Sequence, residues 1–152
     1  MRLLLFILLL CSGITNAQLF TKSDIPKMSL CLVAGAADGY NQVLYAHYST
    51  WKQHHPNAND QYWNPYISWE NKYKDATNGD FSPAYFGSKT FLVFTTDAYH
   101  MTRMIDHTSM LTAVVLSGVT NRDEWWWYAI DFVKYFVARS LGFTITYKLI
   151  YK

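Results

Sequence analysis

Residues 124–151 read EWWWYAIDFVKYFVARSLGFTITYKLIY and predict one long helix. No proline interrupts this stretch, and Gly142 is its single glycine. Residues 90–118 are also free of proline and predict a second helix just before it. The connection at 118–123 is short enough to make these two helices an antiparallel C-terminal pair.

The N-terminal half predicts one further helix and a long loop. Aliphatic side chains and alanines over residues 28–48 predict a helix that is entered through a capping turn at 23–26. It should end near His55, because the residue before a proline is pushed out of the helical region. In residues 56–88, asparagine, proline, glycine and aromatic residues replace the aliphatic ones and predict an aromatic-rich loop. The expected fold class is all-α, with three to four helices.

The N-terminal segment has the three-part layout of a secretory signal peptide. Arg2 supplies a positive charge, residues 3–10 form an apolar run, and small residues at Thr15 and Ala17 precede a cleavage point. We therefore expect residues 1–17 to be removed, leaving 18–152 as a single exported helical domain on the extracytoplasmic side. Cys31 would be its only cysteine, so an internal disulfide is excluded.

Composition excludes several classes of protein. The 152 residues are 51% hydrophobic, 18% aromatic and only 16% charged, which excludes a disordered chain. A net charge of +2, with no basic run, argues against nucleic acid as a partner. Gly-rich phosphate loops, Cys-x-x-Cys pairs and Gly-x-Ser-x-Gly motifs are absent from the sequence.

The C-terminal helix also carries the pattern of a transmembrane helix. Aromatic belts at 125–128 and 147–151 are about 20 residues apart, as at the two interfaces of a bilayer. Arg139, Asp131 and Lys134 oppose insertion and bring the summed insertion free energy close to zero. Asp131 and Lys134, three residues apart, can pair and face neighbouring helices. A free soluble bundle cannot turn three consecutive tryptophans to one core stripe. We therefore expect a membrane-associated protein with a transmembrane helix here.

One helix face gathers most of the candidate chemistry. Asp97, His100, Arg103 and His107 are spaced three, three and four residues apart, and Asp38 can join them from the first helix. Asp38, Asp97 and His100 are the candidate ligands of a divalent metal, and all five residues are candidate catalytic groups. The plainer alternative is a polar network between helices, in which Asp97 accepts hydrogen bonds from His100 or Arg103 and no cofactor is bound.

The loop supplies candidate binding residues. Trp63, Tyr66 and Trp69 lie among asparagine, aspartate and glutamine residues, a combination that can stack on sugar rings or anchor a partner protein. The alternative is that these rings cover the open end of a small helical bundle.

Several short segments resemble a group of small exported or membrane-associated bacterial proteins. The resemblance implies no activity or cofactor and adds weight only to residues 38, 97 and 100 as a joint site. The segments that carry it are 34–39, 47–48, 59–65, 68–73 and 95–100.

The sequence favours a non-enzymatic binding or assembly component that is exported and membrane-associated, with a protein as a further partner. Two alternatives remain open: a small metal-dependent hydrolase with an Asp/His site, and a glycan-binding module that acts through the aromatic loop.

Overall fold

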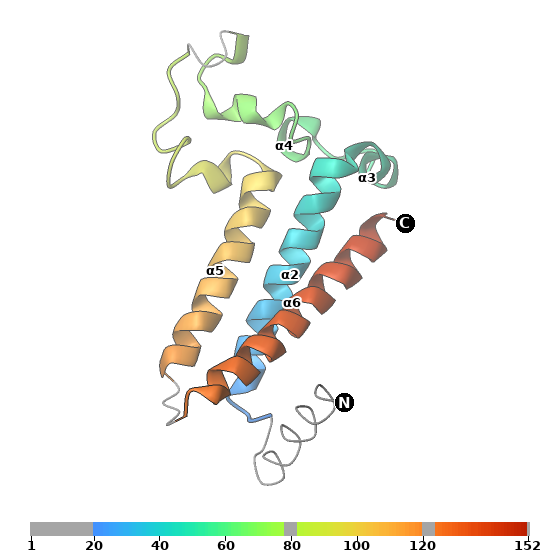
Figure 1. Ribbon diagram of the computed structural model, residues 1–152. Coiled ribbons are helices and arrows are strands. Elements are labelled where there is room, and N and C mark those ends of the chain that lie inside the picture. Colours follow the sequence, from blue (N-terminus) through green and yellow to red (C-terminus); the bar gives the residue numbers. More distant parts are fainter. Residues whose placement is uncertain (1–19, 78–81, 120–123, 152) are drawn as a thin grey trace, which may run out of the picture.

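The computed structural model describes residues 20–77, 82–119 and 124–151, and these residues form a helical molecule (Figure 1). Within these ranges, the only paired extended backbone is one antiparallel bridge between Tyr73 and Ala84. The all-α prediction is therefore confirmed. The predicted signal peptide at 1–17 and most of the turn at 118–123 lie outside the described residues. The elements are α2 (Asp24–Ala46), α3 (Tyr48–His54), α4 (Asp60–Trp63), the 3-10 helices η1 (Ser68–Lys72) and η3 (Val93–Thr95), α5 (Ala98–Val119) and α6 (Trp126–Tyr151).

Helix α2 is the centre of the bundle. Figure 1 shows α5 running antiparallel to α2, and α6 running in the same direction as α2 and crossing it at an angle from a start near the end of α5. Both α5 and α6 make most of their helix contacts with α2. The C-terminal helices are antiparallel, as expected, but they are not the main packing pair, because each of them contacts α2 more extensively than it contacts the other.

The described residues contain five α-helices instead of three to four, for two reasons. His47, at φ −135° and ψ 31°, ends α2, and its Nε2 lies 2.8 Å from the Tyr147 hydroxyl of α6. The expected long helix is thereby divided into α2 and α3. In the loop, the side chain of Asn59 accepts a hydrogen bond from the Gln61 backbone N–H and caps the short α4.

Helix α5 starts later than expected, at Ala98 instead of Thr90. Asp97 accepts a hydrogen bond from the backbone N–H of His100 at 2.8 Å and so satisfies one donor of the first helical turn. Residues 93–95 before it form the 3-10 helix η3.

Glycines allow α2 and α6 to cross at backbone contact. A Cβ on Gly35 would lie 1.9 Å from the carbonyl oxygen of Arg139, and a Cβ on Gly142 would lie 2.1 Å from that of Leu32. Gly39, one turn after Gly35, faces Phe143 in the same way. Any side chain at these positions would force the helices apart.

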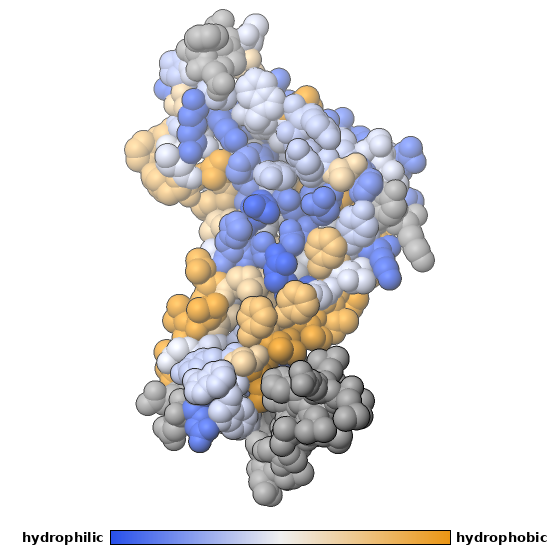
Figure 2. All heavy atoms as spheres, viewed as in Figure 1, coloured by the Kyte–Doolittle hydropathy of each residue, from blue (hydrophilic) through white to orange (hydrophobic). Residues whose placement is uncertain are grey.

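The polarity of the bundle is inverted, because charged side chains lie between the helices while large apolar ones point outward. Asp24, Lys27, Asp97, Asp106, Asp131 and Lys134 are all buried. In Figure 2, hydrophobic residues gather over the lower half of the bundle. We call the following exposed side chains the outer apolar belt: Leu32 and Val33 of α2; Leu111, Val114, Val115 and Val119 of α5; Phe132, Val133, Phe136, Val137, Leu141, Ile145 and Leu149 of α6.

The expected transmembrane helix is contradicted. Across the described residues, none of the helices combines the length and the apolar character that a bilayer crossing requires. In α6, Asp131, Lys134 and Arg139 interrupt the apolar sequence within nine residues. Of the three consecutive tryptophans, Trp125 lies just before α6 and is 81% exposed, so the three do not all face the core.

The segment after α2 closes one end of the bundle. Trp51 of α3 is 1% exposed and packs with Val43, Leu44 and Ala98. Its indole also stacks on His55, with ring centroids 4.5 Å apart. This aromatic cluster fixes the region around the start of α5, where the candidate site lies.

Candidate functional site

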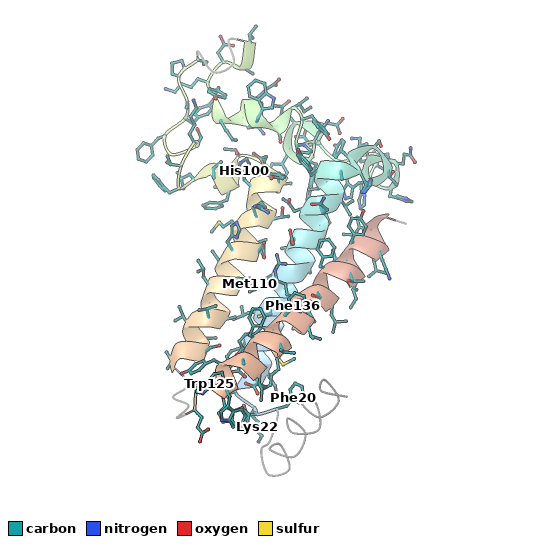
Figure 3. The ribbon with its side chains drawn as sticks, in the orientation of Figure 1. Phe20, Lys22, His100, Met110, Trp125 and Phe136 are labelled. Atoms are coloured by element: carbon teal, nitrogen blue, oxygen red, sulfur yellow. The ribbon has the colours of Figure 1, made fainter. Side chains whose placement is uncertain are left out.

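Asp97 and His100 form a hydrogen-bonded pair at the start of α5, where Figure 3 labels His100. The Nδ1 atom of His100 lies 2.8 Å from both carboxylate oxygens of Asp97. Asp97 is 1% exposed, and its Oδ2 also accepts a hydrogen bond from the Thr96 hydroxyl. The prediction that Asp97 accepts a hydrogen bond from His100 is therefore confirmed.

Lys72 of η1 completes this cluster from the loop. Its Nζ lies 3.5 Å from Nε2 of His100, whose side chain remains 30% exposed. A buried carboxylate that holds Nδ1 leaves Nε2 as the outward atom of the imidazole. The arrangement can accept a proton at Nε2, or it can act as a polar joint between the loop and α5.

The nearby Tyr62 hydroxyl belongs to the surroundings of this pair. Burial, and then the negative charge of Asp97, raise the pKa of Tyr62 above its usual value. The hydroxyl donates to the sulfur of Met101 at 3.2 Å. Tyr62 is therefore neutral over the physiological range and serves as a hydrogen-bond donor.

Asp38 lies in a different cluster, in the middle of the bundle. Nη2 of Arg139 is 2.8 Å from Oδ2 of Asp38 and 3.3 Å from both carboxylate oxygens of Asp106. This interaction joins α2, α5 and α6. Burial alone would lower the pKa of Arg139, but the carboxylates of Asp106 and Asp38 raise it above its usual value. Asp38 thus neutralises an arginine and is not grouped with Asp97 and His100.

The remaining candidates on α5 do not extend the Asp97–His100 pair. His107 is exposed and Arg103 is half-buried. Within the described ranges, no three histidine, cysteine, aspartate or glutamate side chains are grouped so that they could hold a metal ion. The hydrolase alternative is left with the Asp97–His100 pair as its support and stays a prediction.

A second buried charge cluster lies near the start of α2. Lys134 donates to Asp24 at 3.0 Å and to Asp131 at 3.2 Å, and Lys27 lies 3.4 Å from Asp24. The predicted pairing of Asp131 with Lys134 is confirmed. Sequence analysis missed Asp24 and Lys27, although their three-residue spacing was the available signal.

The aromatic residues of the loop are spread over different surroundings. Trp63 packs against Trp51 and Tyr40 at the end of the bundle. Tyr66 is 63% exposed and donates from its hydroxyl to the Tyr45 carbonyl, while Trp69 donates from Nε1 to the Tyr66 carbonyl. Trp63 therefore covers the bundle end, and Tyr66 and Trp69 lie nearer the surface.

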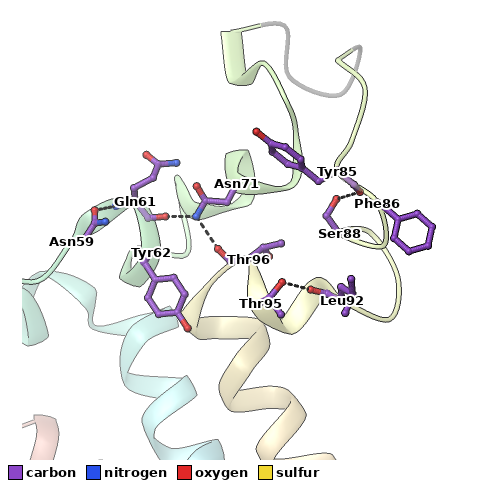
Figure 4. Close-up of a pocket in the computed structure, with 10 residues that line it drawn as sticks. All are labelled: Asn59, Gln61, Tyr62, Asn71, Tyr85, Phe86, Ser88, Leu92, Thr95 and Thr96. Carbon is purple, nitrogen blue, oxygen red and sulfur yellow. Dashed lines mark hydrogen bonds between the residues drawn. The ribbon is translucent and has the colours of Figure 1, made fainter.

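Next to the Asp97–His100 pair, the loop lines a cavity of about 400 Å³ that is open to solvent (Figure 4). One wall comes from α4 and η1 and the other from residues 85–96. Asn71 joins the walls, since its Nδ2 donates to the carbonyls of Gln61 at 2.7 Å and Thr96 at 2.8 Å. This cavity was not predicted from the sequence, where the candidate binding residues of the loop were Trp63, Tyr66 and Trp69.

Comparison with known proteins adds no assignment: the chain matches no family model, no curated protein and no solved structure.

Proposed function

We propose that this chain is an exported, non-enzymatic binding or assembly component that associates with a lipid bilayer through the outer apolar belt. The supporting observation is the inverted polarity of the bundle. Lys134 and Asp131 are each 6% exposed, whereas Phe132 and Phe136 beside them are 69% and 62% exposed. In an aqueous protein, a contiguous apolar patch of this kind marks an interaction surface.

Lipid fits the belt better than a second copy of the chain. A twofold partner covers one patch on one side of each molecule. The belt, by contrast, includes exposed residues from α2, α5 and α6, which are arranged around the bundle. A bilayer surface is much wider than a second copy of the chain, so it can cover neighbouring parts of the belt on more than one helix, and interfacial binding needs only apolar area against the acyl chains.

The inward charges support the same proposal. Ionic side chains next to lipid are stable when they face the interior of a bundle and pair with one another. Lys134 with Asp24 and Asp131 meets that requirement, since each side chain is 6% exposed or less. Arg139 pairs with Asp38 and Asp106 but remains 34% exposed. The part of the bundle around Lys134 can therefore lie against acyl chains without exposing its charges to them.

Vesicle flotation tests the proposal. The mature chain is mixed with vesicles of phosphatidylcholine and phosphatidylglycerol, and the fraction that floats with the lipid is measured. The double variant Phe132→Asp/Phe136→Asp removes two exposed rings, each worth about 1.5–3 kcal/mol when buried, and should lower partitioning roughly tenfold or more.

A matched control adds the same charge elsewhere. Ser49→Asp/Gln53→Asp places two carboxylates on exposed positions of α3 and should float like the unmodified chain. Far-UV circular dichroism checks that both variants keep their helices. If the unmodified chain stays with the aqueous phase, or if it forms a dimer that Phe132→Asp/Phe136→Asp dissociates, the proposal of lipid binding is wrong.

A further inference from the structure

The cavity beside η1 has a lining suited to a neutral polar ligand (Figure 4). None of its ten lining residues carries a formal charge. They are amides, hydroxyl-bearing residues, aromatic rings and one leucine. A volume of about 400 Å³ lies within the range of small-molecule sites. An ionised ligand would find no charged partner on these walls, whereas a hydroxylated one would find both donors and acceptors.

Asn71 is held so that one polar atom remains for a ligand. Both of its amide hydrogens are used, one by the Gln61 carbonyl and one by the Thr96 carbonyl. Its Oδ1 accepts no hydrogen bond from another described residue, and no buried side-chain oxygen or nitrogen among these residues lacks a partner. The Oδ1 atom is therefore open to solvent in a fixed orientation, which suits it to accept from a hydroxyl.

Gln61 and Tyr85 add adaptable groups on the two walls. The Gln61 carboxamide makes two long contacts of 3.4 Å, to the Ile67 carbonyl and to Glu70, and these can be exchanged at little cost. Tyr85 is 53% exposed, so its ring and its hydroxyl can both meet a ligand. An aromatic face beside directed amides matches a sugar ring, which has apolar C–H faces and hydroxyl edges.

We propose that this cavity binds a neutral saccharide, with Asn71 and Gln61 bonding its hydroxyls and the Tyr85 ring packing against its C–H face. The proposal is independent of lipid association. It also differs in place from the rings expected from the sequence, because Trp63, Tyr66 and Trp69 do not line the cavity.

Ligand-observed NMR tests this with three probes: maltose, cellobiose and N,N′-diacetylchitobiose. At least one should bind, and Tyr85→Ala and Gln61→Leu should each weaken that binding about fivefold, the scale of one lost ring contact or directed bond. Neither side chain is buried, so both variants should fold, which circular dichroism verifies. Glucose 6-phosphate serves as the charged comparison and should bind more weakly than the best neutral probe.

Tyr66→Ala is the matched control, since Tyr66 is about as exposed as Tyr85 but lies outside the cavity. It should leave the affinity within about twofold, a change smaller than that of one lost ring contact. The proposal is overturned if none of the three probes binds at about 10 mM, which corresponds to a free energy weaker than about −3 kcal/mol. It is also overturned if Tyr66→Ala or Trp69→Ala abolishes binding while Tyr85→Ala does not, or if the phosphorylated sugar binds best.

Discussion

Asp24 illustrates how a single buried carboxylate is stabilised in this bundle. Its side chain is 1% exposed and accepts hydrogen bonds from the Thr21 backbone N–H and from Nζ of Lys134. Burial alone would raise the pKa of Asp24, but these two donors and the positive charge of Lys134 lower it to about 2. The folded state therefore prefers the ionised carboxylate more strongly than the unfolded state does.

The stability of the protein should consequently fall in acid. A pKa lowered from 3.8 to about 2 stabilises the folded state above pH 4, on the order of 2 kcal/mol, and this contribution is lost as the pH falls from about 4 to 2. In urea titrations, the free energy of unfolding of Asp24→Asn should lie below that of the unmodified chain by that amount at pH 7, and by much less at pH 2. An unchanged difference at pH 2 would contradict the assignment. Asp60→Asn is the control. Asp60 pairs with Lys52 at the surface, so its replacement should lower the free energy of unfolding at pH 7 by less than Asp24→Asn does.

Arg139 pairs with both Asp38 and Asp106, so replacing it removes a positively charged partner from two carboxylates at once. Arg139→Leu should lower the free energy of unfolding by about 1–2 kcal/mol, less than for a fully buried ion pair, because the Arg139 side chain is 34% exposed while Asp106 is buried. Adding Asp106→Asn should recover part of that loss, because Asp106 is 3% exposed and its charge is then removed. Chemical unfolding of the single and double variants measures the coupling. Arg103→Leu, on the same bundle, is the control and should cost less; an equal cost would show that Arg139 has no special role.

Sequence spacing predicted the short-range pairs but not the long-range one. Asp131 and Lys134 are three residues apart on α6, and Asp97 lies three residues before His100 at the start of α5, so both contacts follow from local geometry. Asp38 and Arg139 are 101 residues apart, and their contact depends on how α6 crosses α2. The sequence consequently placed Asp38 with the wrong neighbours, close to the expected metal ligands.

At the level of the elements, the α2–α6 crossing depends on residues without side chains. Gly35 and Gly39 are spaced so that both face α6, and Gly142 of α6 faces α2. From the sequence, Gly142 was noted only as the single glycine of the expected C-terminal helix, and Gly35 and Gly39 were given no role. The four-residue spacing of Gly35 and Gly39 was the signal for close packing. Its partner at Gly142 could not be identified before the crossing was known.

Replacing these glycines should destabilise the bundle, although alanine is the better helix former. A Cβ at Gly35 or Gly142 would collide with backbone atoms that cannot rotate away, so each alanine variant should cost about 2 kcal/mol or more. Gly118→Ala is the matched control, because a Cβ there meets nothing within 4 Å, and it should stabilise α5 by about 0.5–1 kcal/mol. Thermal unfolding of the three variants checks the opposite signs. A stabilising Gly35→Ala would show that the two helices do not cross at backbone contact.

The helix boundaries show which local signals were sufficient. The helix end before Pro56 was predicted correctly from the backbone rule, since α3 ends at His54. The expected capping turn at 23–26 was wrong, because α2 begins at Asp24 and Ser23 makes no side-chain capping hydrogen bond. The division at His47 was not predicted, since no proline or glycine marks it and its side chain bonds to Tyr147, a hundred residues away. Tertiary contact, rather than local preference, therefore ended α2.

At the scale of the whole molecule, the accessibility of the Cys31 thiol depends on whether α2, α5 and α6 remain packed against one another. Its side chain is 0% exposed on α2 and packs with Ala113 of α5 and with Tyr135 and Ala138 of α6. Burial also raises the pKa of its thiol, even though Arg139 acts in the opposite direction, so little thiolate is present at neutral pH. An alkylating reagent can reach Cys31 only when α5 or α6 leaves α2.

Alkylation of Cys31 should accordingly be slower than that of free cysteine by about a thousandfold or more, because it requires an opening that costs several kcal/mol. Peptide mass spectrometry follows Cys31 separately from Cys11. If the folded bundle is the form that binds lipid, phosphatidylglycerol vesicles should slow the reaction further, since a ligand of the folded state lowers the open population. Phe132→Asp/Phe136→Asp should remove that additional protection while leaving the rate without vesicles nearly unchanged. Rapid alkylation of the unmodified chain in buffer would mean that the central position of α2 is wrong, whereas slow alkylation that vesicles do not alter would argue against lipid as the occupant of the belt.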